Sequence, residues 1–283
     1  MAAQLMPGAP VAEAVFADLV PRIKSLDRPP GLATILVGDD PASAGYIRQK
    51  QTKAAELGLY SAHEHLSAEA TQADLLAVVR AFNDDRAVDA MLIQHPIPKH
   101  LDYEAALLQI DPDKDADGLH PTNLGRLVLS IPGPVPCTPA GIEALLAHYE
   151  IPVAGRNVVI VGRGFTLGRP LALILSQKRP TANAAVTVVH TGVPDWPGYT
   201  RRADVLIAAA GVPSIVMPEH VRPGAVVVNG GLNYEGRRII PDVDESVAEV
   251  AGWITPRVGG VGVTTVAMLM RNTVEAAERR QAR

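Results

Sequence analysis

Apolar residues in the first third of the chain form short continuous runs that alternate with longer segments of helical spacing. "LATILVGDD" (32–40) is aliphatic and β-branched and ends in turn-forming residues, which predicts a buried strand. Asp40 can cap a helix that follows, with Pro41 at its first position and Gly58 as its stop. We therefore expect a helix over roughly residues 41–57, directly after the strand.

The alternation continues to residue 98. "SAEATQADLLAVVRAFNDD" (67–85) begins with a capping-box pattern and has helical periodicity, whereas "VDAMLIQHPIP" (88–98) is a second apolar run that leads into a proline-rich loop. A strand, a helix and another buried strand predict an α/β unit.

The second half of the chain has four apolar strands separated by helical or loop segments. "NVVIVGRGFTLGRPLALILSQK" (157–178) predicts a strand, a glycine turn and a helix, and "AAVTVVHT", "ADVLIAAAG" and "AVVVNGG" predict three further strands. Strands that are apolar on both faces indicate a parallel sheet covered by helices, as in a Rossmann-type domain. "PGPVPCTPAG" (132–141) resembles a junction, so we place a domain boundary near 137–140.

The composition indicates a globular protein with two domains. The chain has 283 residues, of which 47% are hydrophobic and 20% charged, which fits two packed domains rather than a disordered chain. The net charge is -4 and basic residues form no stripe, so no nucleic-acid partner is expected. Cys137 is the only cysteine, which excludes an internal disulfide and a cysteine-based metal site. No leader or long apolar run is evident, and we expect a cytoplasmic protein without membrane association.

The glycine turn predicts a dinucleotide site. Gly162, Gly164 and Gly168 lie between a strand and a helix, where a bare backbone lets phosphate oxygens reach the amides of the helix N-terminus. The spacing G-x-G-x-x-x-G is one residue longer than the common fingerprint, and a tight turn without a ligand is the alternative.

The strand after that turn indicates which dinucleotide is bound. It ends in His190 and Thr191, where an NAD site usually has a carboxylate for the ribose hydroxyls. With Arg163 inside the turn, the local charge favours a 2'-phosphate, and therefore NADP over NAD. An ordinary solvated arginine is the alternative for Arg163.

A second group of polar residues lies in the front half. Tyr46 and Lys50 are one helical turn apart, Gln94 ends a strand, and Asp115 and Asp117 lie in the polar loop "DPDKDADGLHPTN". Lys50 could donate or accept a proton, and Tyr46 could stack on a flat ligand. A solvent-exposed Tyr–Lys pair is the alternative, and spacing alone does not decide between them.

Seven ordered blocks resemble a known family. "SAGYIRQKQTKAAELG", "LIQHPIPKHLD", "DPDKDADGLHPTNLGRL", "PCTPAGI", "VVIVGRGFTLGRPLA", "ADVLIAAAG" and "GGVGVTTVAMLMRNT" are similar to the bifunctional methylenetetrahydrofolate dehydrogenase / methenyltetrahydrofolate cyclohydrolase family. The resemblance implies oxidation of 5,10-methylenetetrahydrofolate with NADP and hydrolysis of the methenyl product to 10-formyltetrahydrofolate. It also implies a role in one-carbon metabolism and purine biosynthesis, and a homodimer.

The resemblance further implies an α/β fold with two lobes, whose last helix returns to the first. The folate-binding domain would comprise 1–138 and 265–283, and the NADP-binding Rossmann domain 139–264. It implies that Lys50 is the catalytic lysine, that Gln94 tunes it and that Asp117 binds the pterin, and it places Asp117 and Tyr46 with them among the catalytic residues. The remaining implied contacts are Ser43, Tyr46, Gly259 and Gly260 for the substrate, and Gly162, Arg163, Gly164, Gly168, His190, Thr191 and Thr265 for the cofactor, with no metal.

The chain departs from the family pattern at several positions. His95 replaces a leucine after Gln94, which places a titratable group beside the expected site. It could only fill space, or a protonated imidazole could lower the pKa of Lys50. Further departures are Gly164, Asn229, Val258, Val263 and Thr264. A dehydrogenase with weak cyclohydrolase activity and a non-catalytic binding paralogue therefore remain alternative functions.

Overall fold

The fold is described by a computed structural model that covers residues 2–235 and 238–282. It divides into two compact units. Unit 1 comprises Met1–Glu13 and Thr138–Thr265, and unit 2 comprises Ala14–Cys137 and Val266–Arg283. Both are α/β units, as the hydrophobic pattern predicts.

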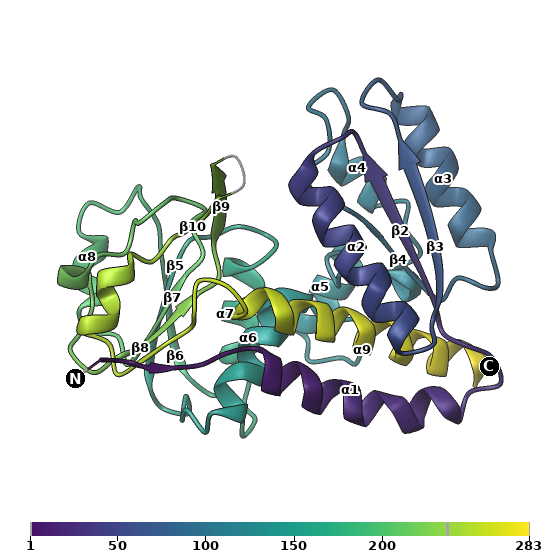
Figure 1. Cartoon of the computed structure of the whole chain (residues 1–283). Helices are drawn as coiled ribbons and strands as arrows, with labels where there is room; N and C mark the ends of the chain where they lie inside the picture. The colour runs from purple at the N-terminus through teal and green to yellow at the C-terminus, as the bar shows by residue number, and fades with distance from the viewer. Residues whose placement is uncertain (1, 236–237, 283) are drawn as a thin grey trace. The chain divides into compact units, whose positions relative to one another are not determined.

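Unit 2 is built on a parallel sheet of strand order β3-β2-β4. The strands are β2 (Gly31–Val37), β3 (Tyr60–Leu66) and β4 (Ala90–Ile93), and the helices α2 (Pro41–Glu56) and α3 (Gln72–Asp84) connect them. Every residue of β2 and β4 is buried, which explains their continuous apolar runs. In Figure 1, α2 lies beside β2 and β3, which it contacts.

The strand β3 was not predicted, because its sequence "YSAHEHL" is polar and most of its residues are exposed. It forms one edge of the sheet, where solvent replaces the packing that makes a strand apolar. The shorter elements of this unit are α4 (Tyr103–Leu107), the 3₁₀ helix η1 (Pro112–Lys114) and α5 (Pro121–Val128), while α1 (Ala9–Lys24) begins in unit 1.

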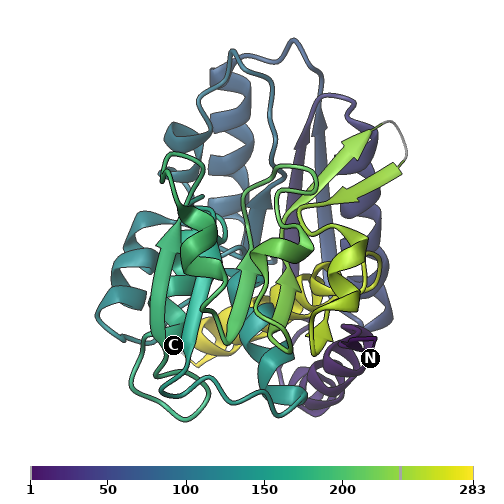
Figure 2. The ribbon, with the colours of Figure 1, turned by 90° about the vertical axis from the view of Figure 1, so that its left-hand side faces the viewer.

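Unit 1 contains a six-stranded parallel sheet of order β1-β11-β8-β7-β5-β6. Its elements are β1 (Gln4–Leu5), α6 (Cys137–His148), β5 (Asn157–Val161), α7 (Gly168–Leu175), β6 (Ala185–Val189), α8 (Trp196–Thr200), β7 (Val205–Ala208), η2 (Pro218–His220), β8 (Val226–Asn229), η3 (Glu245–Glu249) and β11 (Trp253–Ile254). The hairpin of β9 (Leu232–Glu235) and β10 (Arg238–Pro241), light green in Figure 2, forms a separate two-stranded sheet. The predicted strands of the Rossmann-type domain are therefore present and parallel.

The first thirteen residues fall in unit 1, whereas the expected first domain began at residue 1. The strand β1 extends the sheet of unit 1 by pairing with β11, and the amide of Met6 donates to the carbonyl of Ile254 at 2.9 Å. A strand of two residues gives no periodicity, so the sequence carried no signal for this placement.

The last helix, α9 (Val261–Gln281), begins in unit 1 and continues in unit 2. Within unit 2, the side-chain amide of Asn272 donates to the carbonyls of Ala116 and Val135, both at 2.9 Å. Arg22 binds Glu278 through two hydrogen bonds. The expected return of the last helix to the first lobe is therefore confirmed.

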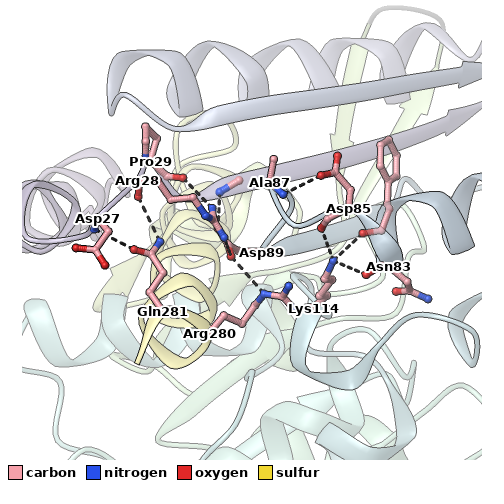
Figure 3. Close-up of polar contacts among 12 residues, drawn as sticks. Asp27, Arg28, Pro29, Asn83, Asp85, Ala87, Asp89, Lys114, Arg280 and Gln281 are labelled. Atoms are coloured by element: carbon pink, nitrogen blue, oxygen red, sulfur yellow. Dashed lines mark hydrogen bonds and ion pairs between the residues drawn. The ribbon is translucent and has the colours of Figure 1, made fainter. Parts of the chain in front are cut away.

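Figure 3 shows a further attachment of the C-terminal end of α9. Asp89 is fully buried and accepts two hydrogen bonds from Arg28, at 2.7 and 2.6 Å. Arg280 lies 3.4 Å from the same carboxylate, and Gln281 bonds the backbone of Asp27 and Arg28. In residues 2–235 and 238–282, no helix is long and apolar enough to cross a membrane.

Candidate functional site

Lys50 is aimed by a hydrogen bond to Gln94. The Nζ atom of Lys50 donates to Oε1 of Gln94 at 3.0 Å, and the lysine is only 8% exposed. A surface Tyr–Lys pair would leave the ammonium in water, so the burial of Lys50 argues against that alternative. Tyr46 lies one turn earlier on α2 and is half-buried.

Asp40 and Pro41 determine where the helix α2, which carries Tyr46 and Lys50, begins. Asp40 has extended backbone angles, and its side chain accepts the amide of Ser43 at 2.8 Å, as an N-cap does. Pro41 begins the helix. Ser43 is 2% exposed and forms part of this first turn, so it supports the helix on which Tyr46 and Lys50 lie.

Gln94 is held at the carboxyl end of β4. Its backbone amide donates to the carbonyl of Ile35 at 2.8 Å, which continues the ladder between β4 and β2. Its side-chain Nε2 donates to the carbonyl of His95 at 2.8 Å. The amide group therefore has a fixed orientation, with its oxygen toward Lys50 and its nitrogen toward the backbone.

Asp115 and Asp117 lie in the same polar loop but have different surroundings, which the sequence alone did not reveal. Asp115 is 2% exposed and accepts from the amides of Gly118 and His120, at 3.0 and 2.8 Å, and from the side chain of Asn123. Burial raises the pKa of Asp115. Asp117 is half-buried between buried neighbours. Asp115 thus braces the loop, which leaves Asp117 as the carboxylate available to a ligand.

Lys114 braces the same loop from its other side, and sequence analysis missed it. It is fully buried, and its Nζ donates to the carbonyls of Phe82, Asn83 and Asp85 at 2.8, 2.7 and 2.8 Å, as Figure 3 shows. These carbonyls lie at the C-terminal end of α3, where a cation is favoured. A lysine in a polar loop gives no sign of such burial before the fold is known.

Tyr103 is another residue that sequence analysis missed. Its ring lies edge-on to that of His95, with 5.1 Å between the ring centres. Burial raises the pKa of Tyr103, and the charges of Asp117 and Asp115 raise it further. An aromatic residue in "HLDYEAALL" carries no signal for this position.

His95 packs its ring against that of Tyr103. Partial burial of its ring lowers the pKa of His95 below the ordinary value. The lowered pKa disfavours the protonated form of His95, which argues against the interpretation in which a protonated imidazole acts on Lys50.

Cys137 lies beneath the same loop. Its Sγ donates to the carbonyl of Ala116 at 3.3 Å and is 3.4 Å from the side-chain nitrogen of Asn272. The residue is 4% exposed, and burial raises the pKa of its thiol. A protonated, enclosed thiol packs and does not react.

The glycine turn of unit 1 leaves no room for a side chain at two of its three glycines. Gly162 has a φ of 127°, and a Cβ atom there would lie 2.0 Å from the carbonyl oxygen of Ala209. A Cβ atom on Gly168 would lie 2.2 Å from the carbonyl oxygen of Gly162, whereas Gly164 faces open space. Leu167 precedes α7 and offers no side-chain acceptor to its first amides. Gly164 leaves one side of the turn open, and the amide of Arg169 donates to the carbonyl of Gly164 at 3.1 Å.

The residues expected around the 2'-phosphate lie at the same edge of the sheet. Val161 and Val189 are paired, so the turn after β5 and the end of β6 are neighbours. Arg163 and Thr191 are exposed, and Nδ1 of His190 accepts the amide of Gly192 at 3.1 Å. The side chains in this corner are a cation, an imidazole and a hydroxyl, which fits a phosphate better than a pair of ribose hydroxyls.

The remaining expected residues also lie in unit 1. Gly259 has a φ of 78° and accepts the amide of Gly8 at 2.7 Å, and Gly260 precedes α9. Thr265 donates to the carbonyl of Val261 at 3.0 Å and lies 3.2 Å from the hydroxyl of Thr138. Gly259 and Gly260 therefore belong to a different unit from the other expected substrate residues, Ser43, Tyr46 and Asp117.

Two departures from the family pattern have structural partners. The side chain of Asn229 donates to the carbonyl of Gly231 at 3.0 Å and accepts the amide of Val243 at 3.2 Å, so it closes the turn after β8. Thr264 is fully buried and donates to the carbonyl of Val261 at 2.9 Å. Val258 is 65% exposed.

Comparison with known families gives matches to both units. The catalytic domain of the tetrahydrofolate dehydrogenase/cyclohydrolase family matches residues 6–117, and the NAD(P)-binding domain of that family matches residues 136–281.

Individual relatives match over almost the full length. The chain is 64% identical over 280 residues to bifunctional protein FolD 1 of Salinispora tropica, covering 98% of this chain and 92% of that one. It is 59% identical over 286 residues to bifunctional protein FolD of Syntrophotalea carbinolica, covering 100% and 99%. The crystal structure of the Trypanosoma brucei methylenetetrahydrofolate dehydrogenase-cyclohydrolase complexed with NADP and an inhibitor superposes with a TM-score of 0.92, at 35% identity and with 99% of each chain covered.

Proposed function

The chain belongs to the tetrahydrofolate dehydrogenase/cyclohydrolase family, and we propose that Lys50, oriented by Gln94, is its catalytic lysine. The enzyme oxidises 5,10-methylenetetrahydrofolate with NADP and hydrolyses the methenyl product to 10-formyltetrahydrofolate. The observation that carries the role of Lys50 is its 3.0 Å hydrogen bond to a fixed amide from a buried position.

The hydrolytic step explains why an oriented amine is needed. Attack of water on the methenyl carbon removes a proton from the water, and opening of the ring delivers a proton to the departing nitrogen. A single amine held at a fixed angle can serve both transfers, whereas a mobile lysine would lose the alignment. Gln94 supplies that angle, because its own nitrogen is bound to the backbone of His95.

The oxidative step places a different demand on the site. NADP, when bound, accepts the hydride from the methylene carbon. Gly162, Gly164 and Gly168 would hold its pyrophosphate at the start of α7, and Arg163, His190 and Thr191 its 2'-phosphate, with Thr265 as a further contact. These residues position the cofactor and take no part in proton transfer, so oxidation depends less on Lys50 than hydrolysis does.

We assign Tyr46 and Asp117 as substrate contacts. Tyr46 would pack its ring against the pterin, and Asp117 would accept hydrogen bonds from the pterin's ring nitrogens. Ser43 supports the first turn of α2, and the family resemblance supports Gly259 and Gly260 as further substrate contacts. The half-buried Asp117, held by buried neighbours on both sides, supports its role as the pterin anchor.

A two-signal assay tests this function. Purified protein is given 5,10-methylenetetrahydrofolate and either NADP or NAD, and reduced cofactor and methenyl absorbance are followed together. We expect reduced NADP to accumulate while the methenyl signal passes through a maximum and falls. Steady methenyl accumulation would favour the dehydrogenase with weak cyclohydrolase activity, and silence in both signals would favour a non-catalytic paralogue.

The resemblance to the family also supports a homodimer that acts in the cytoplasm. Light scattering coupled to size-exclusion chromatography tests the dimer, which requires twice the mass of one chain. Fractionation of the source cells tests the compartment.

A further inference from the structure

Asp242 is a buried carboxylate that the proposed reaction does not use. It is fully buried at the start of the segment after β10. Its Oδ2 accepts the amides of Ala210 and Gly211, at 2.7 and 2.8 Å, and its Oδ1 accepts the side chain of Asn233 at 3.1 Å. All three partners donate hydrogen bonds, which is the pattern that an ionised carboxylate requires.

The two amides bound by Asp242 belong to the segment that follows β7. This segment, Ala209–Gly211, packs against the glycine turn, since a Cβ atom on Gly162 would lie 2.0 Å from the carbonyl oxygen of Ala209. Asp242 therefore fixes the backbone that forms one wall of the dinucleotide turn.

The carboxylate of Asp242 also packs against the turn after β8. A Cβ atom on Gly231 would lie 2.0 Å from Oδ2 of Asp242, and the amides of Gly230 and Gly231 donate to the carbonyl of Ala208, at 2.8 and 3.0 Å. The backbone segments that follow β7 and β8 therefore both contact the buried side chain of Asp242.

The order of the strands gives this arrangement a functional meaning. In the sheet β8-β7-β5-β6, the chain runs from β5 outward to β6 and then returns to β7 on the other side of β5. A dinucleotide binds across such a switch point, at the carboxyl ends of the strands. The glycine turn and the end of β6 serve the adenosine half, so the ends of β7 and β8 border the other mononucleotide.

We propose that Asp242 is a positioning residue of the dinucleotide site, which holds the segment Ala209–Gly211 in the conformation that NADP binds. This inference rests on the proposed function. Asp242 acts through the two backbone amides and does not itself touch the cofactor.

The test measures NADP⁺ affinity by isothermal titration calorimetry in three variants. Asp242→Ala removes the acceptor, and Asp242→Asn keeps one oxygen that can accept both amides. The matched control is Asp204→Ala, because Oδ2 of Asp204 accepts the amide of Asn157 at 2.8 Å at the amino ends of the same strands. Circular dichroism and thermal melting show that each variant is folded.

We expect Asp242→Ala to weaken NADP⁺ binding by about tenfold or more, because the part-buried amides of Ala210 and Gly211 lose their shared acceptor. Asp242→Asn should weaken it by about threefold or less, and Asp204→Ala by less than about twofold. If Asp242→Ala does not fold, Asp242→Ser replaces it, since a serine hydroxyl is too short to reach both amides.

Wild-type affinity in folded Asp242→Ala would overturn the inference, as would equal weakening in Asp204→Ala. Loss of affinity in Asp242→Asn equal to that in Asp242→Ala would also overturn it, because rescue by the amide oxygen would have failed. The same titration of the wild-type protein separates the two proposals. Absence of NADP⁺ binding there contradicts the proposed function and this inference together, whereas the variant outcomes above contradict the inference alone.

Discussion

The Nζ atom of Lys50 lies 3.0 Å from the Oε1 atom of Gln94, and this contact joins the middle of α2 to the carboxyl end of β4. Neither residue depends on the other for its backbone position. Asp40 fixes the start of α2, and the ladder to β2 fixes Gln94. The helix α2 and the strand β4 therefore orient the amine of Lys50 together. Proton transfer is faster when the transferring group is held in a fixed orientation before the reaction.

Lys50→Met should abolish hydrolysis more completely than hydride transfer. Methionine keeps most of the buried volume and removes the proton-carrying group, so we expect hydrolysis to fall by about a hundredfold or more. Methenyl disappearance and NADP reduction are measured on the same preparation. Lys53→Met is the control, because Lys53 lies on the same helix and pairs with Glu56 on the surface. Equal retention of both rates in Lys50→Met would refute the assignment of Lys50.

His95→Leu should leave the pH profile of hydrolysis unchanged above neutral pH. Burial lowers the pKa of His95, so the imidazole is neutral there and its removal takes away no charge. Rates are measured from about pH 5.5 to 9, a range that spans the ordinary histidine pKa. His100→Leu serves as the control, since the ring of His100 bonds the carbonyl of Ala70. A shift of the profile above pH 7 would show that His95 acts on Lys50.

Some elements could be predicted because their cause lies in adjacent residues. Burial on both faces makes a strand a continuous apolar run, as in β2, β4, β5 and β7. A capping residue and a terminating glycine mark the two ends of α2. Strand β3 lies at an exposed edge and has no apolar pattern. The pairing of Lys50 with Gln94 was implied by the family resemblance, and spacing alone did not decide it. The roles of Lys114 and Asp242 depend on backbone groups brought together by folding, for which no spacing along the chain gives a signal.

Cys137 should be inert to thiol reagents in the native protein. It is 4% exposed, and burial together with the nearby charge of Asp117 raises the pKa of its thiol. At pH 8 we expect alkylation by iodoacetamide at least about a hundredfold slower than for a free thiol. Labelling is quantified by mass spectrometry, with protein in guanidinium chloride as the positive control. Rapid native labelling would show that the thiol is reachable.

Gly118→Ala should destabilise unit 2 more than Gly58→Ala does. Both glycines have positive φ values, 71° and 77°, but a Cβ atom on Gly118 would lie 2.3 Å from the carbonyl carbon of Val135. A Cβ atom on Gly58 meets open space. We expect a loss of unfolding free energy of about 1 kcal/mol for Gly58→Ala. The loss for Gly118→Ala should be about 3 kcal/mol or more, because a backbone clash is added. Urea denaturation followed by circular dichroism measures both, and equal losses would contradict the steric argument.

Arg163→Ser should reduce the preference for NADP over NAD. The guanidinium of Arg163 is exposed beside the end of β6, where it can pair with a 2'-phosphate but gains nothing from a ribose hydroxyl. We expect KM for NADP to rise by about tenfold, while KM for NAD stays within about twofold. Arg156→Ser is the control, because Arg156 is also exposed but precedes the amino end of β5, whereas the glycine turn follows its carboxyl end. An equal rise for both cofactors would mean that Arg163 shapes the glycine turn, and an unchanged KM for NADP would assign the phosphate to other groups at this edge.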